Sequence, residues 1–250
     1  GDRIRVGIRQ PEGIVSRPAE FLQHLAGALE REGGILRTRT RVRRIVRDGR
    51  DFSRIELDSG EQLAGSSLLI ASGIWSRDLV AQLGLRIPME PAKGYHLMVT
   101  METPPRGAGV LSEACVVVNP MGAAVRLAGT LEFSGLNHRL IRSRIDQLER
   151  ATHAYLPGLA RATRTSVWCG LRPCTGDGLP AIGPVPGTPN AFLATGHAMM
   201  GVTLGPGTAQ LIADAIERRP WPTWARPLST DRFRDRSASE TRSTPAVPGR

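Results

Sequence analysis

The chain has 250 residues, of which 40% are hydrophobic, and 33 Lys and Arg outnumber 23 Asp and Glu to give a formal net charge of +10. This hydrophobic content is ordinary for a globular protein and excludes wholesale disorder, and no apolar run approaches the roughly 20 residues that span a bilayer. Lys93 is the only lysine, and no zinc-finger or RNA-binding motif accompanies the arginines. We therefore attribute the arginine excess to codon composition and expect no nucleic-acid partner.

The cysteines and the first residues indicate where the protein resides. Cys115, Cys169 and Cys174 are an odd number in a chain far larger than a disulfide scaffold, which favours a reducing compartment. No further Cys or His lies at ligand spacing from the last two, so we expect no metal site. We expect a cytoplasmic protein, with peripheral attachment to the inner membrane as the alternative. The start has neither an initiator methionine nor a signal-peptide pattern, which predicts an origin inside a longer protein.

A strand at residues 4–8 and a helix over residues 18–31 are the first predicted elements. Proline at position 18 suits the first turn of a helix, and the glycine pair at 33–34 suits its end. The helix has one apolar face, formed by Phe21, Leu22, Leu25, Ala28 and Leu29.

Short strands are predicted next, at residues 35–36, 42–46 and 53–57, with an Asp-Gly hairpin turn at 48–49. A near-continuous apolar segment then ends at Gly73, which is typical of a parallel strand buried on both faces. Glycine at this position lets the backbone pass close to a ligand, and a plain strand-to-helix turn is the alternative interpretation.

The second half of the chain predicts an antiparallel sheet with a helix packed against it. Strands are expected at 115–119 and 124–128, joined by a turn at 120–122, and the helix lies within 139–155. Residues 191–194 then predict a buried strand, followed by a glycine-rich turn and a last helix, a geometry in which backbone N–H groups face a ligand. The apolar face of the last helix consists of Leu211, Ile212, Ala215 and Ile216.

Motifs late in the chain resemble the C-terminal signature of FAD-dependent amine oxidoreductases, and the D-amino-acid dehydrogenase branch is most similar. They are Gly-Leu-Arg-Pro at 170–173, Asp-Gly-Leu-Pro at 177–180, Ile-Gly at 182–183, and Ala-Thr-Gly-His at 194–197 with Gly201 and Thr203. Pro91, Lys93 and Gly94 also match the segment through which that family enters its substrate domain. Glycine oxidases carry an arginine where Met199 stands, which counts against that branch.

The resemblance implies a mixed α/β fold, with a partial Rossmann-like FAD-binding domain and an inserted antiparallel-sheet substrate domain. Residues 1–85 would hold part of the FAD-binding domain and the start of the substrate domain, and residues 86–170 the substrate-binding sheet. Residues 171–234 would complete the FAD-binding domain, and residues 235–250 would be a disordered tail. The family's dinucleotide-binding βαβ unit, with its Gly-x-Gly-x-x-Gly turn, is missing from residues 1–70.

The function implied by the resemblance is oxidation of the amine of an amino acid, most often a D-amino acid, by hydride transfer to FAD. The partners would be a small amino-acid substrate, the missing N-terminal FAD-binding segment, and a quinone or oxygen as electron acceptor. A non-catalytic truncated fragment or partner subunit of such an enzyme is an alternative, as is a sarcosine-, glycine- or proline-type amine oxidase. A basic nucleic-acid module is the least favoured reading.

The same resemblance assigns the site. Arg172 would bind the substrate carboxylate, because a guanidinium pairs with both oxygens in a fixed orientation. His197 would lie beside the flavin, although a lone histidine is more often a hydrogen-bonded core residue, and Tyr95 is a further catalytic candidate. The residues expected to bind the cofactor are Val42, Ala71, Gly73, Trp75, Gly94, Gly170, Gly196, His197, Met199, Met200, Gly201, Val202 and Thr203.

Overall fold

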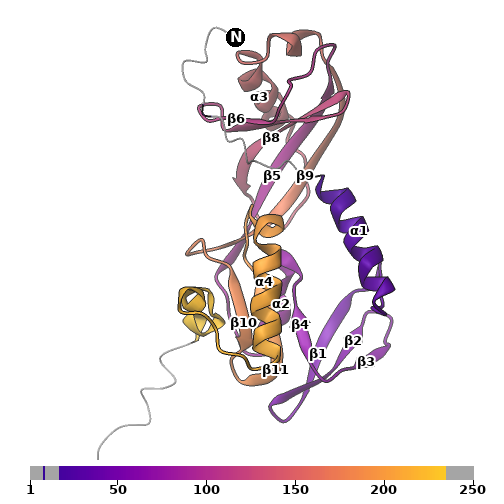
Figure 1. The fold of residues 1–250 in the computed structure, drawn as a ribbon, viewed down its shortest axis with the longest axis vertical. Helices are drawn as coiled ribbons and strands as arrows, with labels where there is room; N and C mark the ends of the chain where they lie inside the picture. The colour runs from indigo at the N-terminus through magenta and orange to yellow at the C-terminus, as the bar shows by residue number, and fades with distance from the viewer. Residues whose placement is uncertain (1–7, 9–16, 235–250) are drawn as a thin grey trace, which may run out of the picture. The chain divides into compact units, whose positions relative to one another are not determined.

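A computed structural model describes Ile8 and residues 17–234, which fall into two compact units. Unit 1 contains the described residues up to Thr38 together with Pro91–Arg172, and unit 2 contains Arg39–Glu90 together with those from Pro173 to 234. The chain leaves unit 2 for unit 1 on one long strand and returns on another (Figure 1). The predicted strand at 4–8, apart from Ile8, and the predicted tail at 235–250 lie outside the described residues.

Unit 1 is built on a five-stranded sheet with one helix against it, as the sequence predicted. In spatial order its strands are β6 (Gly109–Leu111), β7 (Val116–Met121), β8 (Ala124–Phe133), β5 (Met89–Thr100) and β9 (Thr163–Thr175). Pairing from β6 through β5 is antiparallel. β7 continues through Pro120 and Met121, so the β7–β8 turn is shorter than expected and lies at Gly122, whose φ is 69°.

Helix α3 (Arg142–His153) packs against β7 and β8 (Figure 1). Its Leu148 joins an apolar core beneath the sheet, and the short 3₁₀ helix η2 (Pro157–Arg161) adds Leu159. The other buried residues of this core alternate along the strands: Leu97, Val99, Met101, Val116, Val118, Val125 and Leu127. This period-two pattern leaves the alternate residues of β5 and β8 on the opposite face of the sheet.

Helix α1 (Pro18–Arg31) has the predicted bounds, but none of its residues is buried. The predicted apolar face is left uncovered within the described residues, because Phe21, Leu22, Leu25 and Leu29 are each about half exposed. Periodicity shows which face of a helix is apolar and does not show what covers that face. The strand predicted at 35–36 is also wrong, since those residues pair with no strand.

Unit 2 contains two small sheets. The first is a meander of β1 (Val42–Asp48), β2 (Asp51–Leu57) and β3 (Gln62–Ala64), and the second has the order β10 (Ala181–Val185), β11 (Thr188–Thr195) and β4 (Leu68–Ile70). β4 pairs in parallel with β11, as predicted, but it is short and Leu69 is 45% exposed, so burial on both faces is not observed.

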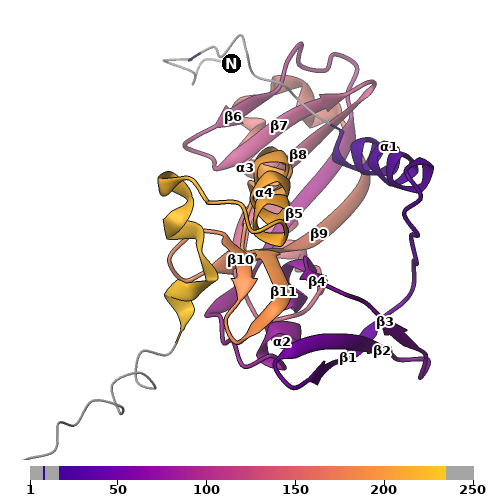
Figure 2. The same ribbon diagram turned by 60° about the horizontal axis from the view of Figure 1, so that its bottom comes forward.

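Helix α4 (Gly201–Ile216) covers β10 and β11 and buries Leu211 and Ile212 against Phe192 (Figures 1 and 2). It begins at Gly201 and includes Pro206, so most of the predicted glycine-rich turn is helical. Ile216, the last residue of the predicted apolar face, is 45% exposed. The remaining helical segments are η1 (Gly73–Trp75), α2 (Ser76–Ala81), η3 (Thr223–Leu228) and η4 (Thr230–Phe233).

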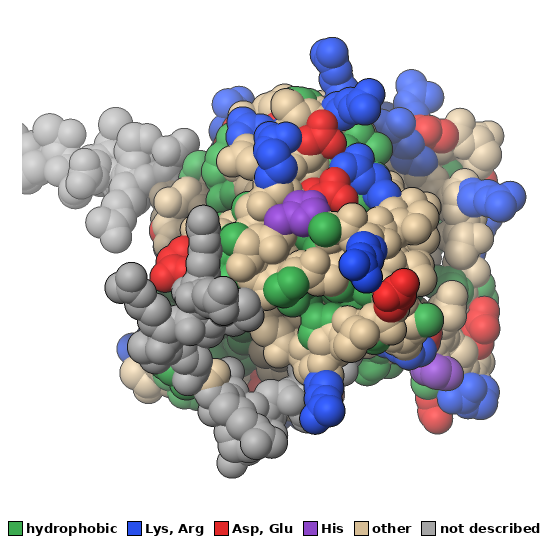
Figure 3. Space-filling view, turned by 90° about the horizontal axis from the view of Figure 1, so that it is seen from above, with side chains coloured by type: hydrophobic (Ala, Val, Ile, Leu, Met, Phe, Trp, Pro, Cys, Tyr) green, Lys and Arg blue, Asp and Glu red, His purple; other side chains and the backbone are tan. Residues whose placement is uncertain are grey.

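The surface carries both signs of charge. On the face shown in Figure 3, Lys and Arg side chains are interspersed with Asp and Glu. Over the part of the chain that the structure describes, no helix has the length and apolar character needed to cross a membrane.

Candidate functional site

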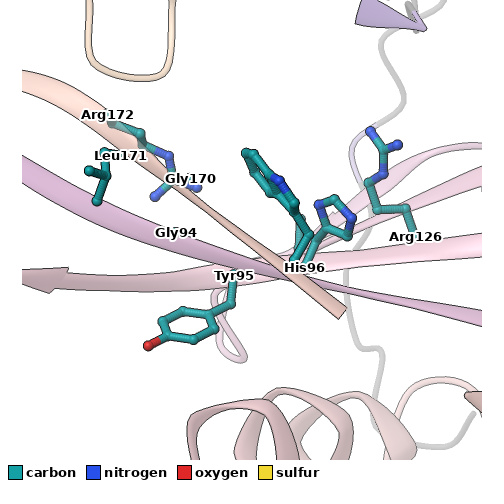
Figure 4. Close-up of a pocket in the computed structure, with 9 residues that line it drawn as sticks. Gly94, Tyr95, His96, Arg126, Gly170, Leu171 and Arg172 are labelled. Atoms are coloured by element: carbon teal, nitrogen blue, oxygen red, sulfur yellow. The ribbon is translucent and has the colours of Figure 1, made fainter. Parts of the chain in front are cut away.

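The first cluster of site residues lies on the face of the unit 1 sheet opposite α3. Because side chains alternate along a strand, Gly94 and His96 of β5 face this side, whereas Lys93 and Tyr95 face the other. Figure 4 shows Arg172, His96 and Arg126 extending to one side of the strands and Tyr95 to the opposite side. These residues border a pocket of about 270 Å³, which is lined by Gly94, Tyr95, His96, Arg126, Ala128, Trp168, Gly170, Leu171 and Arg172.

Arg172 is held by two backbone features. The guanidinium lies directly over Gly94, where an ideal Cβ would approach its Nη2 to 2.3 Å. Its Nη1 donates a hydrogen bond of 3.2 Å to the carbonyl oxygen of Thr130. Thr130 has a φ of 68°, and it lies where the β5–β8 register shifts, so that Thr130 and Leu131 together oppose Gly94. This bulge and the missing side chain at residue 94 together fix the guanidinium at the pocket.

A buried ionic cluster lies on the other face of the same strands. Lys93 is 1% exposed, and its Nζ lies 2.9 Å from Glu132 Oε1 and donates to Asn137 Oδ1 and the Arg139 carbonyl, each at 2.9 Å. The Tyr95 hydroxyl donates to Glu132 Oε2 at 2.8 Å. The side chain of Tyr95, the further catalytic candidate, is buried on the side of the strands opposite Arg172, and its catalytic role stays a prediction.

The electrostatics of this cluster favour the ionised pair. A hydrogen bond from Ser134 is the largest cause that lowers the pKa of Glu132, to about 2, and Lys93 and Tyr95 act in the same direction against the effect of burial. Burial is the largest single cause and would lower the pKa of Lys93, but the hydrogen bonds and charges of Glu132 and Tyr95 together outweigh it and the pKa rises. Burial raises the pKa of Tyr95. The charges thus anchor the segment of β5 that carries Gly94.

Sequence reasoning missed three pocket residues: His96, Arg126 and Trp168. The rings of His96 and Trp168 stack with centroids 5.1 Å apart and an interplanar angle of 25°. Gly170 leaves room for this indole, because a Cβ there would lie 2.1 Å from the Trp168 ring. The strand period would have placed His96 on the Gly94 face. Nothing local in the sequence brings Arg126 beside it.

A second cluster gathers at one edge of a unit 2 sheet. Parallel strands end at the same edge, so the residues after β4 and those after β11 meet there. Thr195 Oγ1 donates to the Gly73 carbonyl at 2.7 Å and joins the two loops. The predicted cofactor residues brought to this edge are Ala71, Gly73, Trp75, Gly196, His197, Met199, Met200, Gly201, Val202 and Thr203.

The first turn of α4 lies at this edge and has no side-chain cap. The apolar side chains of Trp75, Met199, Met200 and Val202 are 44–72% exposed around it. Uncapped N–H groups at a helix N-terminus and an exposed apolar surface suit a flat ring with carbonyl acceptors, so the residues here fit a flavin ring.

His197 is held within the same unit. Its Nε2 lies 2.9 Å from Thr208 Oγ1, a residue of α4, and its backbone forms a bridge with Cys174. Burial lowers the pKa of His197, which keeps the ring neutral at pH 7. Its contact with a cofactor remains a prediction.

Three other predicted cofactor residues have different surroundings. Val42 opens β1 and pairs with Leu57, in a sheet separate from the β4–β11 edge. Gly94 and Gly170 lie in unit 1, where the lack of a side chain leaves space for Arg172 and for Trp168, respectively. Within residues 17–234, His, Cys, Asp and Glu side chains form no cluster of metal-site type, and the three cysteines are free thiols.

Known proteins are similar to this chain in sequence and in fold. A family model described as FAD dependent oxidoreductase matches residues 1–215. The D-amino acid dehydrogenase of Cereibacter sphaeroides is 32% identical over 249 residues, which cover 98% of this chain and 56% of that protein. The D-amino acid dehydrogenase of Sinorhizobium medicae is 32% identical over 235 residues, 93% of this chain and 56% of that protein. The chain therefore spans about half the length of the curated relatives it matches.

Solved structures of amino-acid oxidoreductases have a fold similar to that of this chain. Glycine oxidase from Geobacillus kaustophilus aligns with a TM-score of 0.73 and 27% identity over 83% of this chain and 56% of that one. L-proline dehydrogenase from P. horikoshii aligns with a TM-score of 0.77 over 87% of this chain and 60% of that one, and at 16% identity it shares the fold alone. These matches confirm the predicted mixed α/β fold. The chain belongs to the family of FAD dependent oxidoreductases.

Proposed function

We propose that this chain provides the substrate pocket and the flavin-ring edge of an enzyme that oxidises the amine of an amino acid, in particular a D-amino acid. The family and the two D-amino acid dehydrogenase relatives support this proposal. Because the chain spans 56% of the length of these relatives, we assign the pyrophosphate and adenosine of FAD to a further, N-terminal segment with a Gly-x-Gly-x-x-Gly turn. The electron acceptor would be a quinone or molecular oxygen.

The observation that carries the proposal is the placement of Arg172. Its guanidinium is fixed over Gly94 and beside the Thr130 carbonyl, at a pocket whose lining contains no Asp or Glu. A substrate carboxylate is therefore the anion that this site would receive. A planar guanidinium binds both carboxylate oxygens and so fixes the orientation of the α-carbon.

The lining residues suit an amine that reacts in its neutral form. Carboxylates and lysines are absent from the described lining, so it offers no strong base, and two arginines disfavour an ammonium ion. When bound, FAD supplies the hydride-accepting chemistry. The contribution of the chain is to bind the carboxylate and to orient the α-carbon.

The first turn of α4 is the part of the chain that we expect to hold the flavin ring. Its free N–H groups would face the pyrimidine carbonyls, and the helix N-terminus favours negative charge there. The exposed apolar side chains around this turn, of which Trp75 is the largest, would be covered by the ring.

Binding of D-alanine to this chain tests the carboxylate site, measured by calorimetry without flavin. We expect Arg172→Ala to weaken D-alanine binding by at least about tenfold, since truncating one partner of a charge-assisted pair costs about 2–5 kcal/mol. Arg142→Ala removes the same charge from a side chain that is 92% exposed on α3, and it is the matched control. Equal affinities in the two variants would show that Arg172 is not the carboxylate ligand.

Flavin retention tests the division of the cofactor between segments. We expect the purified chain to keep far less than one FAD per chain after desalting, because the dinucleotide anchor is assigned elsewhere. A flavin spectrum near 1:1 after desalting would contradict that assignment.

A further inference from the structure

The second arginine of the pocket points to a particular class of amino acid. Arg126 of β8 shares the lining with Arg172, and its side chain extends to the same side of the sheet (Figure 4). Its Nε is shielded from solvent and has no hydrogen-bond partner, and no carboxylate among the described residues lies within ion-pair distance of it. The Arg126 residue as a whole is partly exposed, so its Nε is a buried donor that a bound anion could accept from.

Strand register places the two arginines at opposite ends of the pocket. Arg126 pairs with Met98 of β5, whereas Arg172 lies over Gly94 of the same strand. Positions 94 and 98 point to the same face and are about 13 Å apart at about 3.3 Å per residue. A guanidinium at each end of this span suits a small molecule with an anionic group at each end.

Between the arginines lies an aromatic surface. The His96 ring stands between Arg172 and Arg126 (Figure 4) and stacks on Trp168, and His96 pairs across the sheet with Ala128. Burial lowers the pKa of His96, and the charge of Arg126 adds to that effect. The ring is therefore neutral at pH 7 and adds a hydrogen-bonding nitrogen without competing for the arginine charges.

We propose that this pocket selects an amino acid with an acidic side chain, whose α-carboxylate binds Arg172 and whose side-chain carboxylate binds Arg126. The inference rests on the proposed role of Arg172 in binding the substrate carboxylate. An amino acid with a neutral side chain would leave the buried Arg126 Nε without an anionic acceptor. Arg126 is then a specificity-determining residue.

D-glutamate and D-glutamine test the proposal, because they have nearly the same size and differ by one charge. Calorimetry on the chain should show D-glutamate binding at least about tenfold more tightly, which is about 1.4 kcal/mol. Arg126→Gln should remove this preference. Arg126→Lys should keep part of the preference, and the exposed Arg142→Gln should keep all of it. Circular dichroism establishes that each variant is folded.

A spectroscopic measurement gives a second readout that a structural role of Arg126 would not produce. A bound side-chain carboxylate offsets the Arg126 charge, so D-glutamate should raise the pKa of His96, followed by NMR of its ring, and D-glutamine should not. An unchanged His96 pKa with saturating D-glutamate would count against the assignment.

The outcomes separate this inference from the proposed function. Equal affinities for the two ligands, a preference that survives Arg126→Gln, or tighter binding of D-phenylalanine than of D-glutamate would each overturn the acidic-substrate inference. The proposed function would still stand if Arg172→Gln weakens all these ligands. If Arg172→Gln changes none of them, or if no amino acid binds, both proposals fail.

Discussion

The guanidinium of Arg172 occupies the space that a side chain on residue 94 would need. An ideal Cβ built on Gly94 would lie 2.3 Å from Nη2 and 2.4 Å from Cζ of Arg172, far inside van der Waals contact. Glycine is therefore required here by the neighbouring side chain and not by a left-handed backbone. The Lys-Gly-Tyr sequence of β5 combines a buried charge, a seat for arginine and a buried hydroxyl in three consecutive residues.

Gly94→Ala should displace the Arg172 guanidinium from the Thr130 carbonyl. We expect D-alanine affinity to fall by about tenfold or more, toward that of Arg172→Ala, because the carboxylate ligand loses its fixed position. The shift would also appear in the NMR signal of Arg172 Nε. Gly109→Ala is the matched control, since residue 109 lies in β6 of the same sheet and a Cβ there meets nothing within 4 Å. Unchanged D-alanine affinity in Gly94→Ala would mean that binding does not require the position of the Arg172 guanidinium over residue 94.

Glu132→Gln should destabilise unit 1 strongly. The substitution keeps the shape of the side chain but leaves Lys93, which is 1% exposed, without its ionic partner. Breaking a buried pair in this way costs about 3–5 kcal/mol. Tyr95→Phe, which removes the hydroxyl and its hydrogen bonds to Glu132 and the Arg139 carbonyl but leaves the ion pair, should cost about 1 kcal/mol. Urea denaturation compares the two variants, and equal losses would show that the charge of Lys93 is not compensated by Glu132.

The same carboxylate makes the stability of unit 1 depend on pH. The folded-state pKa of Glu132 is lowered to about 2 from an ordinary value of 4.5, so folding favours the ionised form. The stabilisation is present in full above about pH 4.5 and is lost as pH falls toward 2, by about 3 kcal/mol if Glu132 acts alone. Denaturation of the wild type at pH 6 and pH 3 should show about 2 kcal/mol of this loss, and Glu132→Gln should show less of it. An equal pH dependence in both proteins would assign the acid sensitivity to other carboxylates.

Local patterns in the sequence predicted where helices and strands lie better than they predicted what packs against them. Proline at position 18 and the glycines after residue 32 predicted the bounds of α1. Its Leu25 and Leu29 are about half exposed, so an apolar stripe does not identify the residues that pack against it. The apolar run before Gly73 correctly predicted a parallel strand. In each case the information lies within a few neighbouring residues.

The pocket depended on long-range pairing that no local pattern specifies. Arg172 was identified through its motif, whereas His96, Arg126 and Trp168 belong to three strands far apart in the chain. They meet because β8 pairs with β5 in one register, with a bulge opposite Gly94. A shift of that register by one residue would turn Arg126 to the α3 face, and the sequence of β8 alone does not exclude it.

Gly201→Ala tests whether residue 201 is glycine because the backbone at the start of α4 requires it or because a flavin ring lies against it. Gly201 is the first residue of the helix, it is not among the glycines with positive φ, and an added Cβ would make an ordinary 3.7 Å contact with His197 Cβ. Alanine should therefore leave the flavin-free chain equally stable, or stabilise it by about 0.4–1 kcal/mol by restricting the unfolded state.

A methyl group on residue 201 would, however, stand between the helix N–H groups and a flavin ring lying on them. We expect weaker FAD binding in an equilibrium fluorescence titration, together with unchanged or higher thermal stability. Gly207→Ala, further along the same helix with nothing within 4 Å of the added Cβ, should show the stability effect alone. Equal FAD affinity in the two variants would place the flavin ring elsewhere than at the start of α4.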